Sequence, residues 1–218
     1  MKKFHISRSG FTFLELLVSI GIFTIITMTV VAGFQSGAQS DTLRLAADNV
    51  AAQLRELVGM AQTGRRIGIC TETQQVGVVC EGAARSVCSD SCVSQVPQGG
   101  YGIHIDRTMQ PVQLSFFADG MPGGTLHSYT IGETIPGAGI DLPRFVVIDD
   151  IRIVGSPTPA ETQQGITTMD IVFEPPEPAI WFNQLQQGIE TRIQMRHEKT
   201  GRTRTIVVRR LSGLIEVE

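Results

Sequence analysis

The sequence predicts an α+β fold in which one long N-terminal helix packs against an antiparallel β-sheet. Three observations lead to this prediction. Residues 11–34 form an apolar run that contains a single ionisable side chain, Glu15. Residues 35–64 continue with apolar side chains at three- and four-residue steps, which is the period of a helix face. Beyond residue 65, short β-rich runs alternate with turn residues such as Gly and Pro.

The composition limits the class of protein. The chain has 218 residues, of which 42% are hydrophobic and 18% charged, so disordered and collagen-like chains are excluded. Its 18 basic and 21 acidic side chains give a net charge of −3, which excludes a protein whose whole surface neutralises nucleic acid. We expect one modest domain joined to an appendage.

The first 34 residues carry the signals of a membrane segment. Residues 1–10 hold three basic side chains and no acid, so we expect them to stay on the cytoplasmic side. Residues 11–34 span about 36 Å as a helix, enough to cross a hydrocarbon core of about 30 Å. A plain signal anchor is the simplest interpretation. Glu15 argues against it, because a carboxylate in hydrocarbon costs about 2.5 kcal/mol or more and needs a partner.

The junction at Gly10 resembles a processing signal. Gly10 is followed by Phe11-Thr12-Phe13-Leu14-Glu15, an order that resembles the class III signal of type IV prepilins and type II secretion pseudopilins. The resemblance implies cleavage by prepilin peptidase between Gly10 and Phe11, N-methylation of Phe11, and retention of the apolar helix. In a stack of such helices, Glu15 of one subunit can neutralise the new Phe11 amine of its neighbour.

The same resemblance implies an organisation for the whole chain. It describes a leader peptide at 1–10, a transmembrane and filament-core helix at 11–34, an amphipathic continuation at 35–64, and an extracytoplasmic β-rich domain at 65–218. The protein would cross the inner (cytoplasmic) membrane once, with its C-terminal domain in the periplasm. Its implied partners are prepilin peptidase, other pilin or pseudopilin subunits, the inner-membrane assembly platform and membrane lipid. We expect no enzymatic activity and no cofactor.

The second part of the helix has one apolar face. Its apolar side chains recur at helical spacing, while most charged side chains fall off that stripe. The stripe consists of Leu43, Ala47, Val50, Leu54, Leu57, Val58 and Ala61. We favour packing on the chain's own sheet over docking in a groove of a partner. We expect the helix to end near Arg65, because Thr63-Gly64 supplies a C-terminal cap.

Beyond the helix, runs rich in β-forming residues are predicted strands. They cover residues 66–70, 75–80, 101–106, 113–118, 145–154, 169–173, 190–198 and 204–209, with a short terminal strand at 214–217. Gly201 can supply a positive φ, so the last two long runs are predicted to form a hairpin. Residues 81–100 and 155–165 are predicted loops, and the proline-rich run 174–178 is predicted to lie on the surface.

Two further stretches carry a weaker resemblance. Residues 66–106 and 190–218 resemble the H-type minor pseudopilins and the fimbrial minor pilins used in DNA uptake. The matching strands are Gly102-Ile103-His104-Ile105-Asp106 and Ser212-Gly213-Leu214-Ile215. This resemblance implies a structural, minor subunit of a type II secretion pseudopilus or a type IV pilus. Secretion, pilus assembly and DNA uptake stay open as alternatives.

The four cysteines follow the membrane segment, on the side where thiols usually oxidise. They are Cys70, Cys80, Cys88 and Cys92, and two disulfides are predicted. A regular hairpin would place Cys70 and Cys80 at opposite ends, so pairs that involve the 81–92 loop are geometrically easier. A Cys₄ zinc site is the alternative, although the sequence lacks the paired C-x₂-C knuckles of such sites.

The C-terminal hairpin carries the one basic cluster of the sequence. From residue 192 onward there are seven basic side chains against three acidic ones. The basic residues are Arg192, Arg196, Lys199, Arg202, Arg204, Arg209 and Arg210. Gly201-Arg202-Thr203-Arg204 matches the G-R-x-R motif of related DNA-uptake minor pilins. DNA binding through Arg202, Arg204, Arg209 and Arg210 is therefore the alternative function, and a solvated hairpin is favoured over it.

Other ionisable side chains form no catalytic pattern. His104, His127 and His197 are scattered among strand and turn segments, where single histidines are more often structural than ligands or bases. Asp141 and Asp149-Asp150 lack the D-x-D-x-D-G spacing of a calcium loop, so a solvated acidic edge is favoured there. No metal site is predicted.

Overall fold

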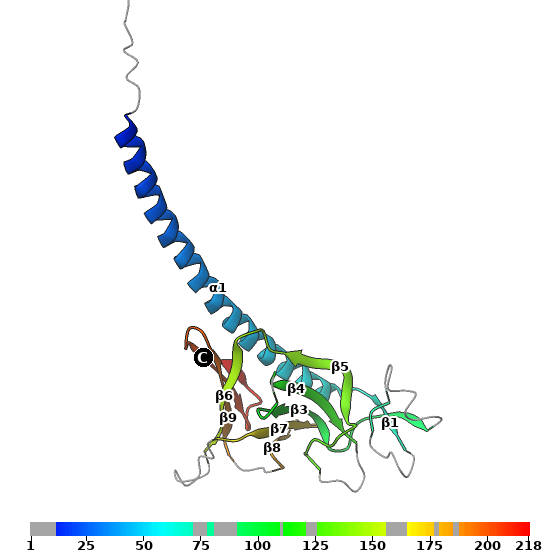
Figure 1. Cartoon of the computed structure of the whole chain (residues 1–218). Helices are drawn as coiled ribbons and strands as arrows, with labels where there is room; N and C mark the ends of the chain where they lie inside the picture. Colours follow the sequence, from blue (N-terminus) through cyan, green and yellow to red (C-terminus); the bar gives the residue numbers. More distant parts are fainter. Residues whose placement is uncertain are drawn as a thin grey trace, which may run out of the picture. The chain divides into compact units, whose positions relative to one another are not determined.

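The described residues form one long helix and three antiparallel sheets (Figure 1). The computed structural model describes residues 12–71, 78–80, 91–109, 111–120, 126–155, 165–176, 179–184 and 188–218, with the backbone alone for 32–38. The chain divides into two compact units, Met1–Asp41 and Thr42–Glu218. The predicted α+β, pilin-like architecture, a long helix packed on antiparallel sheets, is confirmed.

Helix α1 runs from Phe13 to Thr63 and starts and ends at recognisable caps. The Thr12 hydroxyl accepts a hydrogen bond from the Glu15 N–H at 3.3 Å and so caps the first turn. At the other end Gly64 has φ 58°, a left-handed conformation that glycine adopts without a Cβ penalty. The predicted end of the helix at Thr63-Gly64 is confirmed.

The larger sheet has the strand order β5-β4-β3-β7-β8. Its strands are β3 (Gly100–Asp106), β4 (Gln113–Asp119), β5 (Thr134–Asp141), β7 (Thr168–Glu174) and β8 (Ala179–Phe182). Strands β3, β4 and β7 confirm the predicted runs to within one residue at each end. Strand β7 ends at Glu174, before the prolines, as the prediction for 174–178 requires.

The second sheet has the order β11-β10-β9-β6. It contains β6 (Val146–Val154), β9 (Glu190–His197), β10 (Thr203–Arg209) and β11 (Ile215–Val217). The predicted hairpin is confirmed: β9 pairs with β10 from Arg196 opposite Thr203 to Glu190 opposite Arg209. Gly201 in its turn has φ 68°, as expected.

The third sheet pairs β1 (Ile67–Cys70) with β2 (Cys92–Gln95). The prediction of a loop over residues 81–100 is wrong for β2, and β5 and β8 were not predicted at all. Strand β5 contains a proline and two glycines, which disfavour a strand, whereas β8 has β-forming residues but is only four residues long. Pairing with a neighbouring strand forms them instead. The predicted strand 75–80 and loop 155–165 lie mostly outside the described residues.

The domain core lies between α1 and the two larger sheets. Within Thr42–Glu218, one apolar cluster contains the helix stripe together with buried residues of all the strands of those sheets. Leu54 and Ala51 are fully buried, and Val58 is half-buried against the cluster. The stripe therefore packs on the chain's own sheets, which confirms the favoured interpretation. Small alanines on the stripe allow the helix to approach the strands closely.

Candidate assembly surfaces

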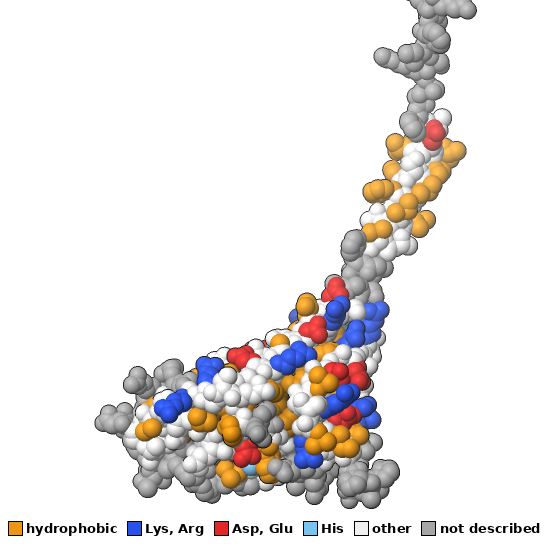
Figure 2. Space-filling model, turned by 180° about the vertical axis from the view of Figure 1, so that it is seen from behind, with side chains coloured by type: hydrophobic (Ala, Val, Ile, Leu, Met, Phe, Trp, Pro, Cys, Tyr) orange, Lys and Arg blue, Asp and Glu red, His pale blue; other side chains and the backbone are white. Residues whose placement is uncertain are grey.

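The N-terminal unit presents an apolar segment to solvent. Residues Phe13–Val31 have a mean hydropathy of 2.2, and none of the segment is buried. Its 19 residues span about 28 Å as a helix, close to the thickness of a hydrocarbon core. Figure 2 shows hydrophobic side chains along this part of α1. Within the described residues it is the one helix able to cross a membrane, a criterion that a signal sequence also meets.

Hydroxyl groups inside this segment are satisfied by the helix itself. Ser19 Oγ donates to the Glu15 carbonyl at 2.7 Å, and Thr24 Oγ1 donates to the Ile20 carbonyl at 2.8 Å. Such bonds keep a hydroxyl paired in an apolar solvent. No cation contacts the Glu15 carboxylate within the described residues. This carboxylate is thus an ionisable group without an ion-pair partner among the described residues.

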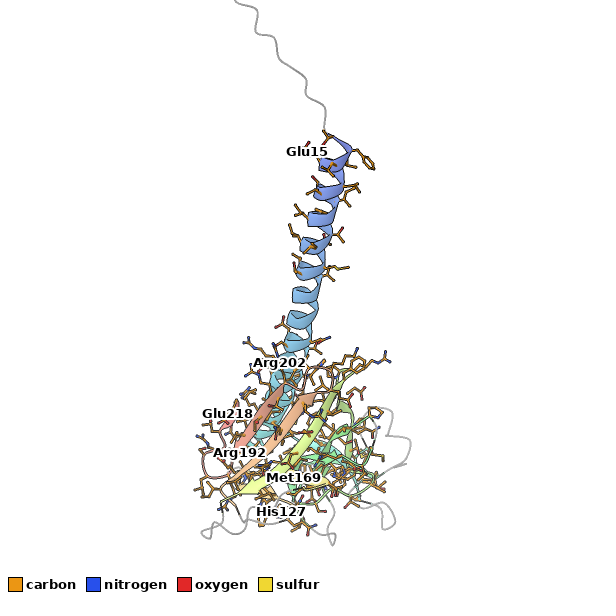
Figure 3. The ribbon with its side chains drawn as sticks, turned by 60° about the vertical axis from the view of Figure 1, so that its left-hand side comes forward. Glu15, His127, Met169, Arg192, Arg202 and Glu218 are labelled. Atoms are coloured by element: carbon orange, nitrogen blue, oxygen red, sulfur yellow. A yellow bond between two sulfur atoms is a disulfide. The ribbon has the colours of Figure 1, made fainter. Side chains whose placement is uncertain are left out.

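Glu15 lies in the first turn of α1, at its N-terminal end (Figure 3). Thr12 stands at the N-cap, since its hydroxyl accepts from Glu15 N–H and its carbonyl accepts from Leu16 N–H at 3.2 Å. Thr12 and Glu15 therefore occupy the two positions of a capping box, which the T-x-x-E spacing could have revealed. Gly10 and Phe11 lie outside the described residues, so cleavage and N-methylation stay predictions.

A disulfide joins Cys80 to Cys92, with the sulfurs 2.04 Å apart. Cys70 is also disulfide-bonded, and Cys88 lies outside the described residues. Sulfurs held in disulfides do not ligate zinc as thiolates, so the described cysteines do not build the alternative zinc site. Among the described residues no three His, Cys, Asp or Glu side chains are grouped so that they could hold a metal ion.

The predicted preference for a pair that involves the 81–92 loop is confirmed, because Cys80 is bonded to Cys92 and not to Cys70. Cys80 N–H donates to the Gly68 carbonyl at 2.9 Å, which places Cys80 opposite Gly68 and two positions from Cys70. Gly68 also leaves the room that the disulfide needs, because a Cβ there would lie 2.9 Å from Cys92 Sγ. Strand residues alone could not show this, since register is set by the pairing of the two segments.

Several arginines of the basic hairpin are already neutralised. Arg192 binds the Glu190 carboxylate at 2.6 Å, and Arg209 binds the Glu216 carboxylate at 3.0 Å. Arg210 Nε donates to a backbone carbonyl at 2.8 Å. Of the four residues considered for DNA binding, Arg209 and Arg210 are therefore engaged within the domain.

Arg202 and Arg204 are placed differently. Both side chains are exposed, and neither has a carboxylate within ion-pair distance in the described part of the chain. Arg204 lies opposite Met195, so it shares the strand face that is buried farther along the sheet. Figure 3 shows Arg202 at the end of the β-domain beside α1, and Arg192 farther down the sheet. The structure thus keeps Arg202 and Arg204 together and separates them from Arg209 and Arg210.

The turn between β9 and β10 contacts the loop before β6. Glu198 N–H donates to the Phe145 carbonyl at 2.8 Å. The Phe145 ring lies under two cations: Lys199 Nζ is 3.9 Å from the ring centroid, and the Arg144 guanidinium carbon is 5.1 Å from it. Phe145 has φ 71°, an outlier for a bulky side chain. Sequence spacing could not reveal this cluster, because its members come from two distant segments.

An open groove of about 910 Å³ follows the start of β6. On its walls Arg107 donates to the carbonyls of Ile148 and Ile166 at 3.2 and 3.1 Å. Arg196 binds the Asp149 carboxylate at 2.7 Å, and the hydrogen bond and charge of Asp149 raise the pKa of Arg196. Both guanidinium groups are therefore engaged within the domain. Asp150 also contacts an arginine, which agrees with an acidic edge rather than a calcium loop.

One histidine belongs to a hydrogen-bonded cluster that the sequence did not indicate. His104 Nδ1 lies 2.6 Å from Asp170 Oδ1 on the neighbouring strand, and the Tyr129 ring stacks on His104 with centroids 4.4 Å apart. Ser115 stands opposite His104 on β4, but no hydrogen bond joins these two described residues. The cluster is therefore a brace between strands and a loop, and it lacks the nucleophile–base contact of a hydrolase.

The other two described histidines are buried. His127 stacks on the Trp181 indole with centroids 3.7 Å apart and lies 3.3 Å from a Glu174 carboxylate oxygen. His197 is 2% exposed at the end of β9. Both positions agree with the structural role predicted for single histidines.

Compared with known proteins, the chain matches no protein-family model, no curated protein and no solved structure. A functional interpretation therefore depends on the two features described above, the open apolar half of α1 and the charged end of the β-domain.

Proposed function

We propose that this chain is a structural, minor subunit of a type II secretion pseudopilus or a type IV pilus, processed by prepilin peptidase and assembled through the N-terminal half of α1. The observation that carries the proposal is the division of one continuous helix. Residues from Leu43 to Ala61 bury one face in the domain, whereas Phe13–Val31 keep their apolar side chains open. An open apolar rod on a folded domain requires lipid or other rods around it.

The chemistry of assembly follows from Glu15. Cleavage after Gly10 creates an α-amino group at Phe11, about one helical turn before Glu15. In a stack of such helices the carboxylate of one subunit pairs with the amine of the next, which offsets the desolvation cost of both charges. The Thr12 cap keeps the first turn helical and holds the carboxylate at a defined position on the rod.

The minor-subunit assignment is supported by one strand and, more weakly, by a short segment that leads into another. The stretch from Gly102 to Asp106 falls within β3, a central strand of the larger sheet, and Ser212-Gly213-Leu214 lead into β11, which begins at Ile215. The first stretch is thus a strand, as the resemblance to H-type minor pseudopilins implies, whereas the second contributes only Ile215 to a strand.

The processing step is tested by the intact mass of the protein extracted from membranes. In cells that contain prepilin peptidase, we expect a species that lacks residues 1–10 and carries one added methyl group. Gly10→Leu should leave the leader attached, because a side chain at this position obstructs the extended backbone in the protease, while Ser9→Ala should be processed normally. An intact Met1 in wild-type protein from peptidase-containing cells would overturn the proposal.

The assembly step is tested by Glu15→Gln, with Glu56→Gln as the matched control on the water-exposed side of the same helix. Loss of a partner from a buried ion pair costs about 3 kcal/mol or more, so recovery of the variant in a sheared filament or pseudopilus fraction should fall about 100-fold. Glu56→Gln should assemble like wild type. Equal recovery of the two variants would contradict the role of Glu15.

A further inference from the structure

The open groove at the start of β6 is large enough to hold a ligand. Its volume of about 910 Å³ lies near the upper end of the range of ligand pockets. Its walls come from the β3–β4 connection and from residues 142–149, with contributions from β9 and from the segment before β7. All of these residues belong to the unit Thr42–Glu218, so the groove lies within one compact unit.

A turn with an unusual backbone places an aromatic ring in the groove wall. The Val146 N–H donates to the Pro143 carbonyl at 3.0 Å, which makes Phe145 the third residue of a β-turn. Phe145 has φ 71°, a conformation that glycine usually supplies at this position. Such strain persists only where the surrounding structure holds it, and it clusters at ligand sites. The half-buried ring lines the groove, where a glycine would leave no side chain.

The charged residues of the groove are three arginines and two acids. Arg107, Arg144 and Arg196 line it together with Asp149 and Glu198. The Arg196 guanidinium binds the Asp149 carboxylate at 2.7 Å, so these two charges offset each other. Arg107 and Arg144 have no carboxylate within ion-pair distance among the described residues. The groove therefore carries an excess of positive charge, although the whole chain has a net charge of −3.

Arg107 is held in place by neutral acceptors. Its Nε donates to the Ile148 carbonyl at 3.2 Å, and one terminal nitrogen donates to the Ile166 carbonyl at 3.1 Å. The other terminal nitrogen donates to the Asp149 carbonyl. These bonds use three of the five guanidinium N–H groups, and carbonyl partners do not cancel the positive charge. A guanidinium fixed in this way binds a carboxylate with little further loss of side-chain entropy.

The outer edge of β6 offers backbone groups beside these side chains. In the described part of the chain β6 is the last strand of its sheet and pairs with β9 alone (Figure 1). The Phe145 carbonyl accepts from the Glu198 N–H, so it faces the β9 side. Backbone groups alternate along a strand, so those of Val146 and Ile148 face away from β9. The Val146 carbonyl and the Ile148 N–H have no hydrogen-bond partner among the described residues outside β6.

From these observations we infer that the groove binds an extended segment of a partner polypeptide, one that carries a carboxylate beside apolar side chains. The segment adds to the outer edge of β6 through the Val146 carbonyl and the Ile148 N–H. Its carboxylate pairs with the guanidinium groups of Arg107 and Arg144, and its apolar side chains pack on Phe145. This binding goes beyond the proposed function and requires no cleavage or assembly step.

A polypeptide uses more of the groove than a compact anion does. Free phosphate can engage the arginines, but it leaves the Phe145 ring and the β6 edge without a contact. Apolar residues such as Val112 and Leu142 also line the groove, and phosphate has no apolar surface to cover them. In strand addition, main-chain bonds supply affinity, and alternate side chains of the added segment supply specificity.

The test begins with a displayed library of random octapeptides, selected on the full chain in nonionic detergent. We expect enriched sequences to carry Asp or Glu beside Val, Ile, Leu or Phe. The most enriched peptide is then synthesised, labelled and titrated by fluorescence anisotropy. Arg144→Glu should weaken its binding about tenfold or more, because repulsion replaces attraction. The matched control Arg66→Glu changes an exposed arginine outside the groove lining and should bind like wild type.

A second variant, Phe145→Gly, separates a binding role of the ring from a structural one. Glycine adopts φ 71° without strain, so the unfolding midpoint of the domain should not fall. Affinity for the selected peptide should nevertheless fall about fivefold or more, because the aromatic contact is lost. Unchanged affinity would overturn the role of the ring. If this variant unfolds, the exposed Arg144→Glu change decides alone.

Three outcomes would overturn the inference as a whole. The first is a library without enrichment of acidic sequences, and the second is a selected peptide that binds wild type and Arg144→Glu equally. The third is a 30-bp DNA duplex at 0.15 M salt that displaces the labelled peptide at a lower concentration than unlabelled peptide does, which would make the groove a nucleic-acid surface. Each leaves the proposed function unaffected, because cleavage and filament assembly are measured separately.

Discussion

In α1 the residues from Phe13 to Val31 and those from Leu43 to Ala61 are equally helical, but their apolar side chains meet different surroundings. The first part exposes Phe, Ile and Val on every side. The second part buries a single stripe, built largely of Leu and Ala, against the two larger sheets. Helix geometry is the same in both, so secondary structure does not decide which solvent each part requires.

The choice of side chains explains the difference. Alanines such as Ala47, Ala51 and Ala61 let the helix backbone approach the strands, and Leu54 and Leu57 fill the remaining space. The first part is rich in β-branched residues, which are poor helix formers in water. In lipid they are tolerated, because every backbone group must then be paired inside the segment. The comparison teaches that the apolar pattern around the helix, and not its helicity, distinguishes a core face from a segment that is apolar on every side and able to cross a membrane.

The largest effect is expected when one apolar side chain is truncated in each part of α1. Leu54→Ala leaves a cavity in the core and should lower the free energy of unfolding of the domain by about 2–5 kcal/mol. Ile20→Ala, in the open part, should leave it unchanged. Denaturant unfolding of the full chain in detergent micelles, followed by the fluorescence of Trp181, measures both. Equal changes in the free energy of unfolding for the two variants would mean that both parts of α1 contribute to the packed core.

The next test asks how much of the domain's stability is covalent. Replacing Cys80 and Cys92 together by Ser removes a disulfide that spans a separation of 12 residues, which should cost about 2–4 kcal/mol. The loss should appear in the same fluorescence measurement. An unchanged unfolding midpoint would show that packing of α1, and not the disulfide, holds β1 and β2 in place.

Removing a polar contact should also affect the two parts of α1 differently, but with a smaller change in the free energy of unfolding. Arg55 donates to the Ile215 carbonyl at 2.7 Å and so ties α1 to β11, whereas Ser19 donates only within its own helix. Arg55→Ala should therefore destabilise the domain by about 1–2 kcal/mol, because the carbonyl loses a charged donor. Ser19→Ala should have no measurable effect on domain unfolding. A neutral Arg55→Ala would exclude this contact as a stabilising link.

Two glycines offer a matched pair within the helix. Neither Gly21 nor Gly59 has an atom within 4 Å of a Cβ that alanine would add. Gly59→Ala should stabilise the domain by about 0.5–1 kcal/mol through helix propensity, while Gly21→Ala lies outside the cooperative unit and should not. The measurement is again the unfolding midpoint. A destabilised Gly59→Ala would indicate that this helical turn must bend.

The smallest effect is expected on the water-exposed side of the buried part. Arg44 and Asp48 form an ion pair at 3.7 Å, with side chains 69% and 51% exposed. Arg44→Ala should change stability by only about 0.3 kcal/mol, and less at high salt, because solvent screens such pairs. A salt-independent loss above about 1 kcal/mol would show that this side of α1 is also packed.

Local sequence patterns predicted the elements whose own residues show a clear helical or strand period. The extent of α1, the central strands β3, β4 and β7, and the β9–β10 hairpin all follow from spacing and turn residues. Strand β5 escaped prediction because its proline and glycines favour turns, and β8 because it has only four residues; they form by pairing with β4 and β7. Residues 81–100 were predicted as a loop for the same reason, although Cys92–Gln95 pair with β1.

The sites divide in a similar way. Glu15 stands out in the sequence because a carboxylate in an apolar run is rare, whereas the His104–Asp170 brace joins residues 66 positions apart. The amino-acid composition of the C-terminal hairpin showed the basic cluster. Which carboxylates pair with Arg192 and Arg209, however, depends on the register of the strands. Spacing along the chain does not encode that register strongly enough to assign individual partners.

The sequence by itself determined that one end of this protein is an apolar helix with a lone acid and that the other is a β-rich domain, because hydrophobic period and turn chemistry act over a few residues. Only the tertiary structure decided that Cys80 meets Cys92, that the second half of α1 is covered by sheets, and that Arg192 and Arg209 pair with carboxylates. These outcomes require segments distant in the chain to pack together, and the free energy of that packing belongs to the assembled core rather than to any one segment.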